Sequence, residues 1–452
     1  MPQIAIFVAK RYAKQAYKHE SYNVRVWPGQ EMVADALRRA GHEVGYCSSA
    51  TVREHRIVLV SLTSMADWWP FVRERRGWPA GDYTVIVGGA GVMNIRPFLH
   101  YADAFVFGRA EGLIVPLAEA LLAGRSFDSP SVAWSKEFSP VRQYVIAQAP
   151  ACYPHPYQLA DGTEHAERAI GCRKRCLFCA YTWHRRHVSS ESGRYADATG
   201  GMGKLGGKGS EETTIEALLS TPRPKWNHYV TVGLDGTSER LRRLVAKKIT
   251  REMFQRFLAH VPVYARTYNI VGLPTESDDD AAEFLDDCRQ SDARAHGTGK
   301  GTVVIHSTPF RAMPATPAAG WPMSTGDHRA RGLCERTGQR KPCLLDGARL
   351  RVFEEPSTDS LVSVLLDALV LRGTERDADV VDRLAATSAF WSAKSAQRVA
   401  TMAKHVDVDR LMGECSPDTL PTAYLDGYAG PTRRIMQSVT KRVAAVGEPY
   451  DL

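Results

Sequence analysis

The chain has 452 residues, of which 44% are hydrophobic and 24% charged, a composition typical of a globular protein with two or three domains. Its formal net charge of +8 favours anionic partners over cationic ones. No apolar run reaches membrane-spanning length and the N-terminus lacks a signal-peptide pattern, so we expect a cytoplasmic protein without a membrane partner.

Short apolar segments alternate with helical patterns over residues 1–150. The segments that read as strands are 4–8, 43–47, 57–61, 85–88 and 104–107, and a helix is expected over 30–40. This alternation predicts an α/β domain with a doubly wound, Rossmann-like parallel sheet. Ligands of such sheets bind at the carboxyl ends of the strands, where segments 61–63 and 88–91 lie.

One connection in this region is unusually short. Only nine residues separate Cys47 from Ile57. They cannot hold the end of a strand, a full helix and two turns. We therefore expect this crossover to lack its helix.

Three cysteines with the spacing CxxxCxxC follow, at Cys172, Cys176 and Cys179. Three thiolates in one short loop can ligate three irons of a four-iron cluster and leave the fourth iron open to a cofactor. The alternative is a structural zinc site with His184 or His187 as the fourth ligand. The other six cysteines are scattered, so the sequence does not indicate a disulfide framework.

The cysteine spacing resembles that of the radical S-adenosylmethionine (radical SAM) superfamily. Three later segments match the same family in the same order. They are 229–241, with an acidic residue at the end of a strand; 268–280, with a Gly-Leu-Pro-x-Glu turn; and 303–317, a strand followed by a barrel-closing segment. A zinc site predicts none of these segments, so the radical SAM interpretation is favoured.

The resemblance implies a 4Fe–4S cluster and SAM as cofactors. Cys172, Cys176 and Cys179 would be the cluster ligands and the catalytic residues. In the family, one electron splits SAM at the open iron into methionine and a 5′-deoxyadenosyl radical. The family also requires an electron donor, such as flavodoxin, as a partner.

Four further residues are candidate cofactor contacts by the same resemblance. Phe178 and Tyr181 would shield the cluster and flank the adenine, with plain core packing as an equal alternative. Asp235 would accept hydrogen bonds from the ribose hydroxyls. Ser238 would either contact the SAM carboxylate or cap the following helix.

The N-terminal domain resembles the cobalamin-binding domain attached to many radical SAM enzymes. The matching segments are 41–44, 61–63, 88–89 and 107–112. The DxHxxG sequence that supplies a histidine to cobalt in some cobalamin proteins is absent. Together with the missing helix, this leaves bound cobalamin an open question.

The expected domains are 1–150, the cobalamin-binding-like domain; 151–330, the radical SAM barrel; and 331–452, a mostly helical C-terminal domain. Only 55 residues separate Cys179 from Asp235, so the (β/α) barrel is expected to be partial and shortened. The glycine-rich segment 200–209 reads either as a flexible surface loop or as a lid over phosphate. Helical patterns follow over 360–371 and 388–403.

Basic segments at 173–175 and 184–187 flank the cysteine loop and favour an anionic substrate, with DNA or a modified nucleotide as the leading candidate. The first functional hypothesis is a radical rearrangement of glycinyl-thymidine in phage DNA, in which case the protein acts in the host cytoplasm. The second is a cobalamin-dependent radical SAM methyltransferase acting on a small-molecule carbon. The third is a non-enzymatic, cluster-bearing module that binds nucleic acid.

Overall fold

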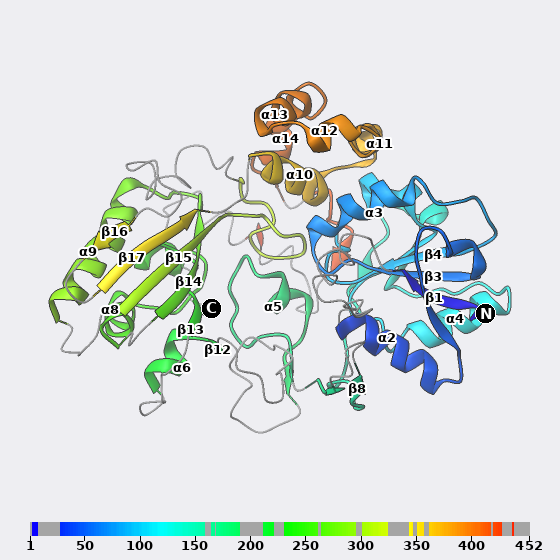
Figure 1. Cartoon of the computed structure of the whole chain (residues 1–452), viewed down its shortest axis with the longest axis horizontal. Coiled ribbons are helices and arrows are strands. Elements are labelled where there is room, and N and C mark those ends of the chain that lie inside the picture. The colour runs from blue at the N-terminus through cyan, green and yellow to red at the C-terminus, as the bar shows by residue number, and fades with distance from the viewer. Residues whose placement is uncertain are drawn as a thin grey trace.

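The computed structural model describes residues 2–7, 28–158, 164–167, 169–189, 211–220, 230–260, 264–294, 301–323, 343–346, 350–356, 361–416, 419–426 and 436–437. These residues form two six-stranded sheets, with the short helix α5 (Ala180–His184) between them and a group of C-terminal helices beside both (Figure 1). The predicted glycine-rich segment 200–209 lies outside the described residues. Among the helices described, none is long and apolar enough to cross a membrane.

The first sheet has the strand order β2-β1-β3-β4-β5-β6, in which β1 to β5 are parallel and β6 is antiparallel. Its strands are β1 (Ile4–Phe7), β2 (Val44–Cys47), β3 (Ile57–Ser61), β4 (Thr84–Gly88), β5 (Ala104–Val106) and β6 (Val132–Trp134). Its helices are α2 (Pro28–Arg39), α3 (Trp68–Arg75) and α4 (Ile114–Leu122). The predicted α/β doubly wound sheet is confirmed.

Alternating side chains of β3 show why both faces are covered. Ile57 and Leu59 pack in the core with α2 and α4, whereas Val58 and Val60 pack in the core with α3. Because successive side chains of a strand point to opposite faces, a continuous apolar run such as this one requires helices on both sides of the sheet.

The crossover from β2 to β3 contains a single 3₁₀ turn, η1 (Val52–Glu54), in place of a helix. The predicted loss of this helix is therefore confirmed. The side chain of Val52 is fully buried and anchors the short connection to the core on the α3 side.

The second sheet has the strand order β12-β13-β14-β15-β17-β16, and β16 alone is antiparallel to its neighbour. Its strands are β12 (Glu211–Thr213), β13 (Val230–Gly233), β14 (Tyr264–Val271), β15 (Gly301–Pro309), β16 (Cys343–Asp346) and β17 (Leu350–Pro356). Its helices are α6 (Ile215–Ser220), α7 (Glu239–Leu244), α8 (Arg251–His260) and α9 (Asp278–Arg294). The helices α6, α8 and α9 share a core with one face of the sheet, and the other face is turned toward α5 (Figure 1).

Two strands of this sheet lie beyond residue 330, where the sequence analysis expected mostly helix. β17 pairs with β15, so the sheet extends to Pro356. The helices begin only with α10 (Leu361–Arg372). The single helix expected over 388–403 is divided into α12 and α13, because Ala393 and Lys394 have extended backbones.

The remaining elements are short. They are α11 (Ala378–Ala386), α12 (Ser388–Ser392), α13 (Ser395–Ala403), α14 (Val408–Met412), η2 (Met65–Asp67), η3 (Arg96–Tyr101), η4 (Ser135–Glu137), η5 (Glu375–Asp377), β7 (Tyr144–Val145), β8 (Tyr157–Gln158), β9 (Glu164–His165), β10 (Ala169–Ile170), β11 (Val188–Ser189) and β18 (Leu425–Asp426).

The C-terminal segment returns to the first domain. β18 pairs in parallel with β7, and the fully buried Tyr424 hydroxyl accepts a hydrogen bond from the Ile95 amide (3.0 Å) and donates one to the Met93 carbonyl (3.1 Å). One cluster of buried side chains therefore runs from β1 through the C-terminal helices to Leu425.

Candidate functional site

A two-stranded ribbon brackets the cysteine loop and α5. β10 pairs with β11 in antiparallel fashion, and the loop lies between them in the chain. Gly171 opens the loop with a positive φ of 66°, and a Cβ atom there would lie 2.6 Å from the Arg185 carbonyl oxygen. Only glycine allows this close approach, which holds the two ends of the loop together.

Backbone and side-chain bonds fix the loop internally. The indole N–H of Trp183 donates to the Cys176 carbonyl (2.9 Å), and the Thr182 hydroxyl donates to the Cys172 carbonyl (2.9 Å). The amide of Lys174 points at the Cys172 sulfur, 3.4 Å away. Such N–H groups directed at sulfur are typical of iron–sulfur sites, because they stabilise negative charge on the ligand.

The three thiols lie close enough together to affect one another electrostatically. Cys176 is buried, whereas Cys172 and Cys179 are partly exposed. Burial raises the pKa of the Cys176 thiol to about 12; nearby Lys247 lowers it, and Asp235 with the other two thiols raises it. The loop therefore brings its three sulfur atoms into one region next to a lysine.

Within the part of the chain that the structure describes, no three Cys, His, Asp or Glu side chains already surround a point where a metal ion could sit. The donor set, three thiols and an N–H···S contact in one loop, fits an iron–sulfur cluster. Of the two histidines in the zinc alternative, His184 has its Nε2 2.7 Å from the Pro314 carbonyl, whereas neither ring nitrogen of His187 has a hydrogen-bond partner among the described residues.

His184 provides a pH-dependent prediction. Burial lowers the pKa of His184 to about 4 from 6.5, so unfolding is coupled to proton uptake between these values. Stability should therefore fall as the pH drops from 6.5 to 4, by about 3 kcal/mol from this group. We expect His184→Gln, which keeps a donor for Pro314, to show a flatter pH dependence in denaturant unfolding over this range. An unchanged slope would contradict this assignment.

The carboxyl end of β13 faces the cysteine loop. Asp235 has a positive φ of 60° and forms an ion pair with Lys247, and both side chains are largely buried. The pair lies over Gly233, since a Cβ atom at this glycine would be 3.1 Å from both Asp235 Oδ2 and Lys247 Nζ. The Leu177 amide donates to the Val245 carbonyl (3.0 Å), which joins the loop to this end of the sheet.

Ser238 has a structural role in this arrangement. Its hydroxyl accepts a hydrogen bond from the Leu241 amide (3.2 Å) as the N-cap of α7, and it also bonds Asp280. The side chain is only 1% exposed. Of the two predicted roles, the helix cap is the one that the structure shows.

The two aromatic candidates occupy different surroundings. Phe178 packs against the main core, as in the packing alternative. Tyr181 lines a cavity of the first domain instead, and the Arg185 guanidinium lies 5.0 Å from its ring centroid.

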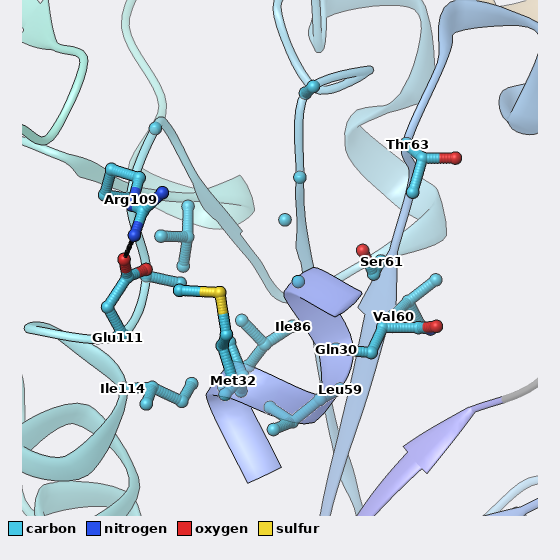
Figure 2. A pocket seen from close by; sticks show the side chains of 18 of the residues that line it. Gln30, Met32, Leu59, Val60, Ser61, Thr63, Ile86, Arg109, Glu111 and Ile114 are labelled. Carbon is cyan, nitrogen blue, oxygen red and sulfur yellow. Dashed lines mark ion pairs between the residues drawn. The ribbon is translucent and has the colours of Figure 1, made fainter. Parts of the chain in front are cut away.

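That cavity lies at the carboxyl edge of the first sheet and has a volume of about 480 Å³. Its walls are mostly apolar and come from β1, β3, β4, α2 and α4; Figure 2 shows Met32, Leu59, Ile86 and Ile114 among them. The size and the apolar walls are typical of a pocket for a small molecule or cofactor. The strand order 2-1-3-4-5 places the topological switch point of the sheet between β1 and β3, and side chains of both strands line the cavity.

Charged groups at the cavity join it to the segment that precedes the cysteine loop. Arg109 forms a bidentate ion pair with Glu167 (2.6 and 2.7 Å) and pairs also with Glu111 (Figure 2 shows the latter pair). Tyr181 and Arg185, which follow the cysteines, line the same cavity. The cavity is thus shared by the first domain and the cysteine-loop region. The sequence analysis matched segment 107–112 but did not identify this ion pair, because Glu167 is 58 residues from Arg109.

Gly89 at the cavity provides a second prediction. Its φ is 105°, and a Cβ atom would lie 2.4 Å from the Leu62 carbonyl oxygen. We expect Gly89→Ala to cost about 2 kcal/mol of stability, since both the backbone conformation and the contact are strained. Gly112→Ala is the matched control, because no atom lies within 4 Å of its Cβ position. Equal denaturation midpoints of the two variants would refute the expectation.

The basic residues near the loop are divided between paired and exposed groups. Lys174 bonds Glu216 (2.9 Å), which ties the loop to α6. Arg175, Arg186 and Lys248 are exposed. Arg175 lies within the cysteine loop and Arg186 shortly after it in the chain.

No protein-family profile matches the sequence, and no curated protein matches it either. Two solved structures show partial similarity: the cobalamin-dependent S-adenosylmethionine radical enzyme OxsB with aqua-cobalamin bound, and the same enzyme with aqua-cobalamin and S-adenosylmethionine bound. Each shares 10% sequence identity with a TM-score of 0.39, over 65% of this chain and 52% of that chain. The chain thus spans about half the length of these structures, and a similarity of this size defines neither its fold nor its function.

Proposed function

We propose that the protein is a radical SAM enzyme whose cysteine loop holds a 4Fe–4S cluster. The observation that carries this proposal is the attachment of the cysteine loop next to the Asp235–Lys247 pair at the carboxyl end of β13, by the hydrogen bond from the Leu177 amide to the Val245 carbonyl. This end of a parallel sheet is where α/β proteins bind ligands. When bound, the cluster would hold SAM at its open iron and supply the electron that cleaves it, with a donor such as flavodoxin as the electron source.

The chain's own residues would bind and orient the cofactor. Cys172, Cys176 and Cys179 would be the cluster ligands, and the Lys174 amide would stabilise the charge on the first of them. The ion pair with Lys247 would hold the Asp235 side chain in place, so that its carboxylate could accept hydrogen bonds from a ribose. The burial of Cys176 excludes water from its side of the site.

For the reaction we propose a radical rearrangement of an anionic substrate, with a modified thymidine such as glycinyl-thymidine in phage DNA as the best candidate. The substrate would lose a hydrogen atom and rearrange before the hydrogen returns. The support is the exposed Arg175 and Arg186, which lie in the cysteine loop and shortly after it in the chain, together with the exposed Lys248 next to Lys247. Cations so placed attract a phosphate-bearing substrate.

The cavity of the first domain favours a second candidate, a cobalamin-dependent methyltransferase. Its apolar walls and the glycines Gly88, Gly89 and Gly108 at its edge would admit a large, flat ligand close to the backbone. Tyr181 and Arg185 would bring such a ligand beside the cysteine loop.

One anaerobic reconstitution tests both candidates. The full chain is incubated with iron, sulfide and hydroxocobalamin, desalted, and examined by absorption spectroscopy; SAM and a reductant are then added, and 5′-deoxyadenosine and methionine are measured. Cluster absorption with SAM cleavage supports the proposal, and retained corrin bands favour the methyltransferase. A colourless protein that cleaves no SAM would overturn both, and the sample treated without iron is the control.

A further inference from the structure

The face of the second sheet that is turned away from α8 and α9, here called the inner face, carries polar side chains. Val232, Thr267 and Ile305 are in register and buried on the helix-covered side, so their neighbours in the strands point the other way. Arg266, Tyr268 and His306 are three of these neighbours. The inner face is the one that looks toward α5 in Figure 1.

Tyr268 is exposed in the middle of a central strand. It is 38% exposed, although β14 has strands paired on both sides. Its ring meets the ring of His306 edge to face, with centroids 5.4 Å apart and an angle of 86° between the planes. An exposed aromatic ring whose position is fixed by a neighbour is suited to stacking against a flat ligand.

Tyr268 lies at the level of the proposed cofactor site. Its carbonyl accepts hydrogen bonds from the amides of Leu234 (2.7 Å) and Asp235 (3.2 Å). It is also in register with Gly233, over which the Asp235–Lys247 pair lies. Adjacent strands are about 4.8 Å apart, so a ligand stacked on Tyr268 would lie directly beside that pair.

Arg266 adds a positive charge on the same face, two residues before Tyr268. Burial lowers the pKa of Arg266, but hydrogen bonds with the side chains of Tyr264 and Tyr268 raise it by more. The pKa of Arg266 is therefore above its ordinary value, and the guanidinium is charged. A ring, a cation and an imidazole therefore lie together on the inner face.

We infer that Arg266, Tyr268 and His306 form a binding site for a nucleotide. The base would stack on the Tyr268 ring, the phosphate would pair with Arg266, and His306 would hold the tyrosine ring edge to face. This inference rests on the proposed function, because the nucleotide would be the substrate that the cofactor site acts on. It goes beyond that function by naming the residues that select the substrate.

Binding of two probes by the reconstituted full chain, measured by calorimetry, tests the site. Thymidine 5′-monophosphate should bind at least about tenfold more tightly than thymidine, because only the monophosphate carries a group for Arg266. Arg266→Gln should remove this difference. Tyr268→Ala should weaken both probes about tenfold, and Tyr268→Phe should preserve their binding.

The control is Arg289→Gln, the same substitution at an exposed arginine of α9 on the helix-covered side of the sheet. It should bind both probes like the unchanged protein. Equal binding of the two probes, or unchanged binding by folded Arg266→Gln and Tyr268→Ala variants, would overturn the inference. SAM cleavage without substrate is measured on the same samples. If SAM is cleaved but the probes do not bind, this nucleotide site alone is rejected. If the probes bind but SAM is not cleaved, the proposed function alone is rejected.

Discussion

Replacing Cys176 by alanine is expected to remove the cluster and to reduce 5′-deoxyadenosine formation by more than about 100-fold. Mutation of residues that only support a metal ligand already lowers affinity or activity by up to about 100-fold, and loss of a ligand itself should cost more. Cys176 is the most deeply buried of the three loop cysteines and the one that Lys247 and Asp235 both influence. Because a cluster held by three thiolates cannot retain its geometry with two, the loss should be seen in the iron content and in the visible absorption as well as in SAM cleavage.

Cys415→Ala is the matched control for this prediction. Cys415 is a partly exposed cysteine near Gly320, far along the chain from the loop, and its amide donates to the Gly320 carbonyl. This variant should keep the iron content and the cleavage rate of the unchanged protein. Normal cluster absorption in folded Cys176→Ala protein would contradict the assignment of the ligands.

Arg372→Met should produce the largest loss of stability. The Arg372 side chain is 2% exposed and donates to four backbone carbonyls, those of Ala319, Trp321, Leu411 and Gly413. Methionine can fill the space but leaves the carbonyls without donors, at a cost of about 1–3 kcal/mol for each buried group that stays unsatisfied. We expect a total loss of at least about 3 kcal/mol.

Amide hydrogen exchange provides a local measurement of this loss. The segments 319–323 and 411–415 are joined by the Met323 amide to the Met412 carbonyl (2.8 Å) and by the Cys415 amide to the Gly320 carbonyl (2.9 Å). Exchange of these two amides should accelerate by more than about 100-fold in Arg372→Met, if opening is local. Arg376→Met, at an exposed position nearby, should change little. Equal exchange rates in the two variants would show that Arg372 does not hold the segments together.

The first sheet could be predicted because its strands carry their own signal. Short apolar runs such as 57–61, followed by helical patterns, require a sheet covered on both faces. The short connection between β2 and β3 was by itself enough to exclude a helix there. The strands β16 and β17 were missed because a long segment of chain separates them from β15. Their place in the sheet depends on pairing with a strand that is distant in the sequence. Local sequence carries little information on such pairing.

The candidate site was predicted only in part, for a similar reason. The spacing of the cysteines is local, so the loop could be found in the sequence. The pairing of Arg109 with Glu167 and the contact between the rings of Tyr268 and His306 join residues that are distant in the chain. Ser238 is a different case. A serine at the start of a helix can cap it or bind a ligand, and only the structure shows that this one caps α7 and bonds Asp280.

The pairing of β18 with β7 has a consequence for folding during synthesis, because part of the fold cannot form until β18 has been translated. Strands β1 to β6 are all translated before the cysteine loop, so the first sheet can fold while the rest of the chain is still on the ribosome. Tyr424 and β18, which close the C-terminal segment onto that sheet, are among the last described residues to emerge. The C-terminal segment therefore cannot close onto the first sheet before β18 has been translated.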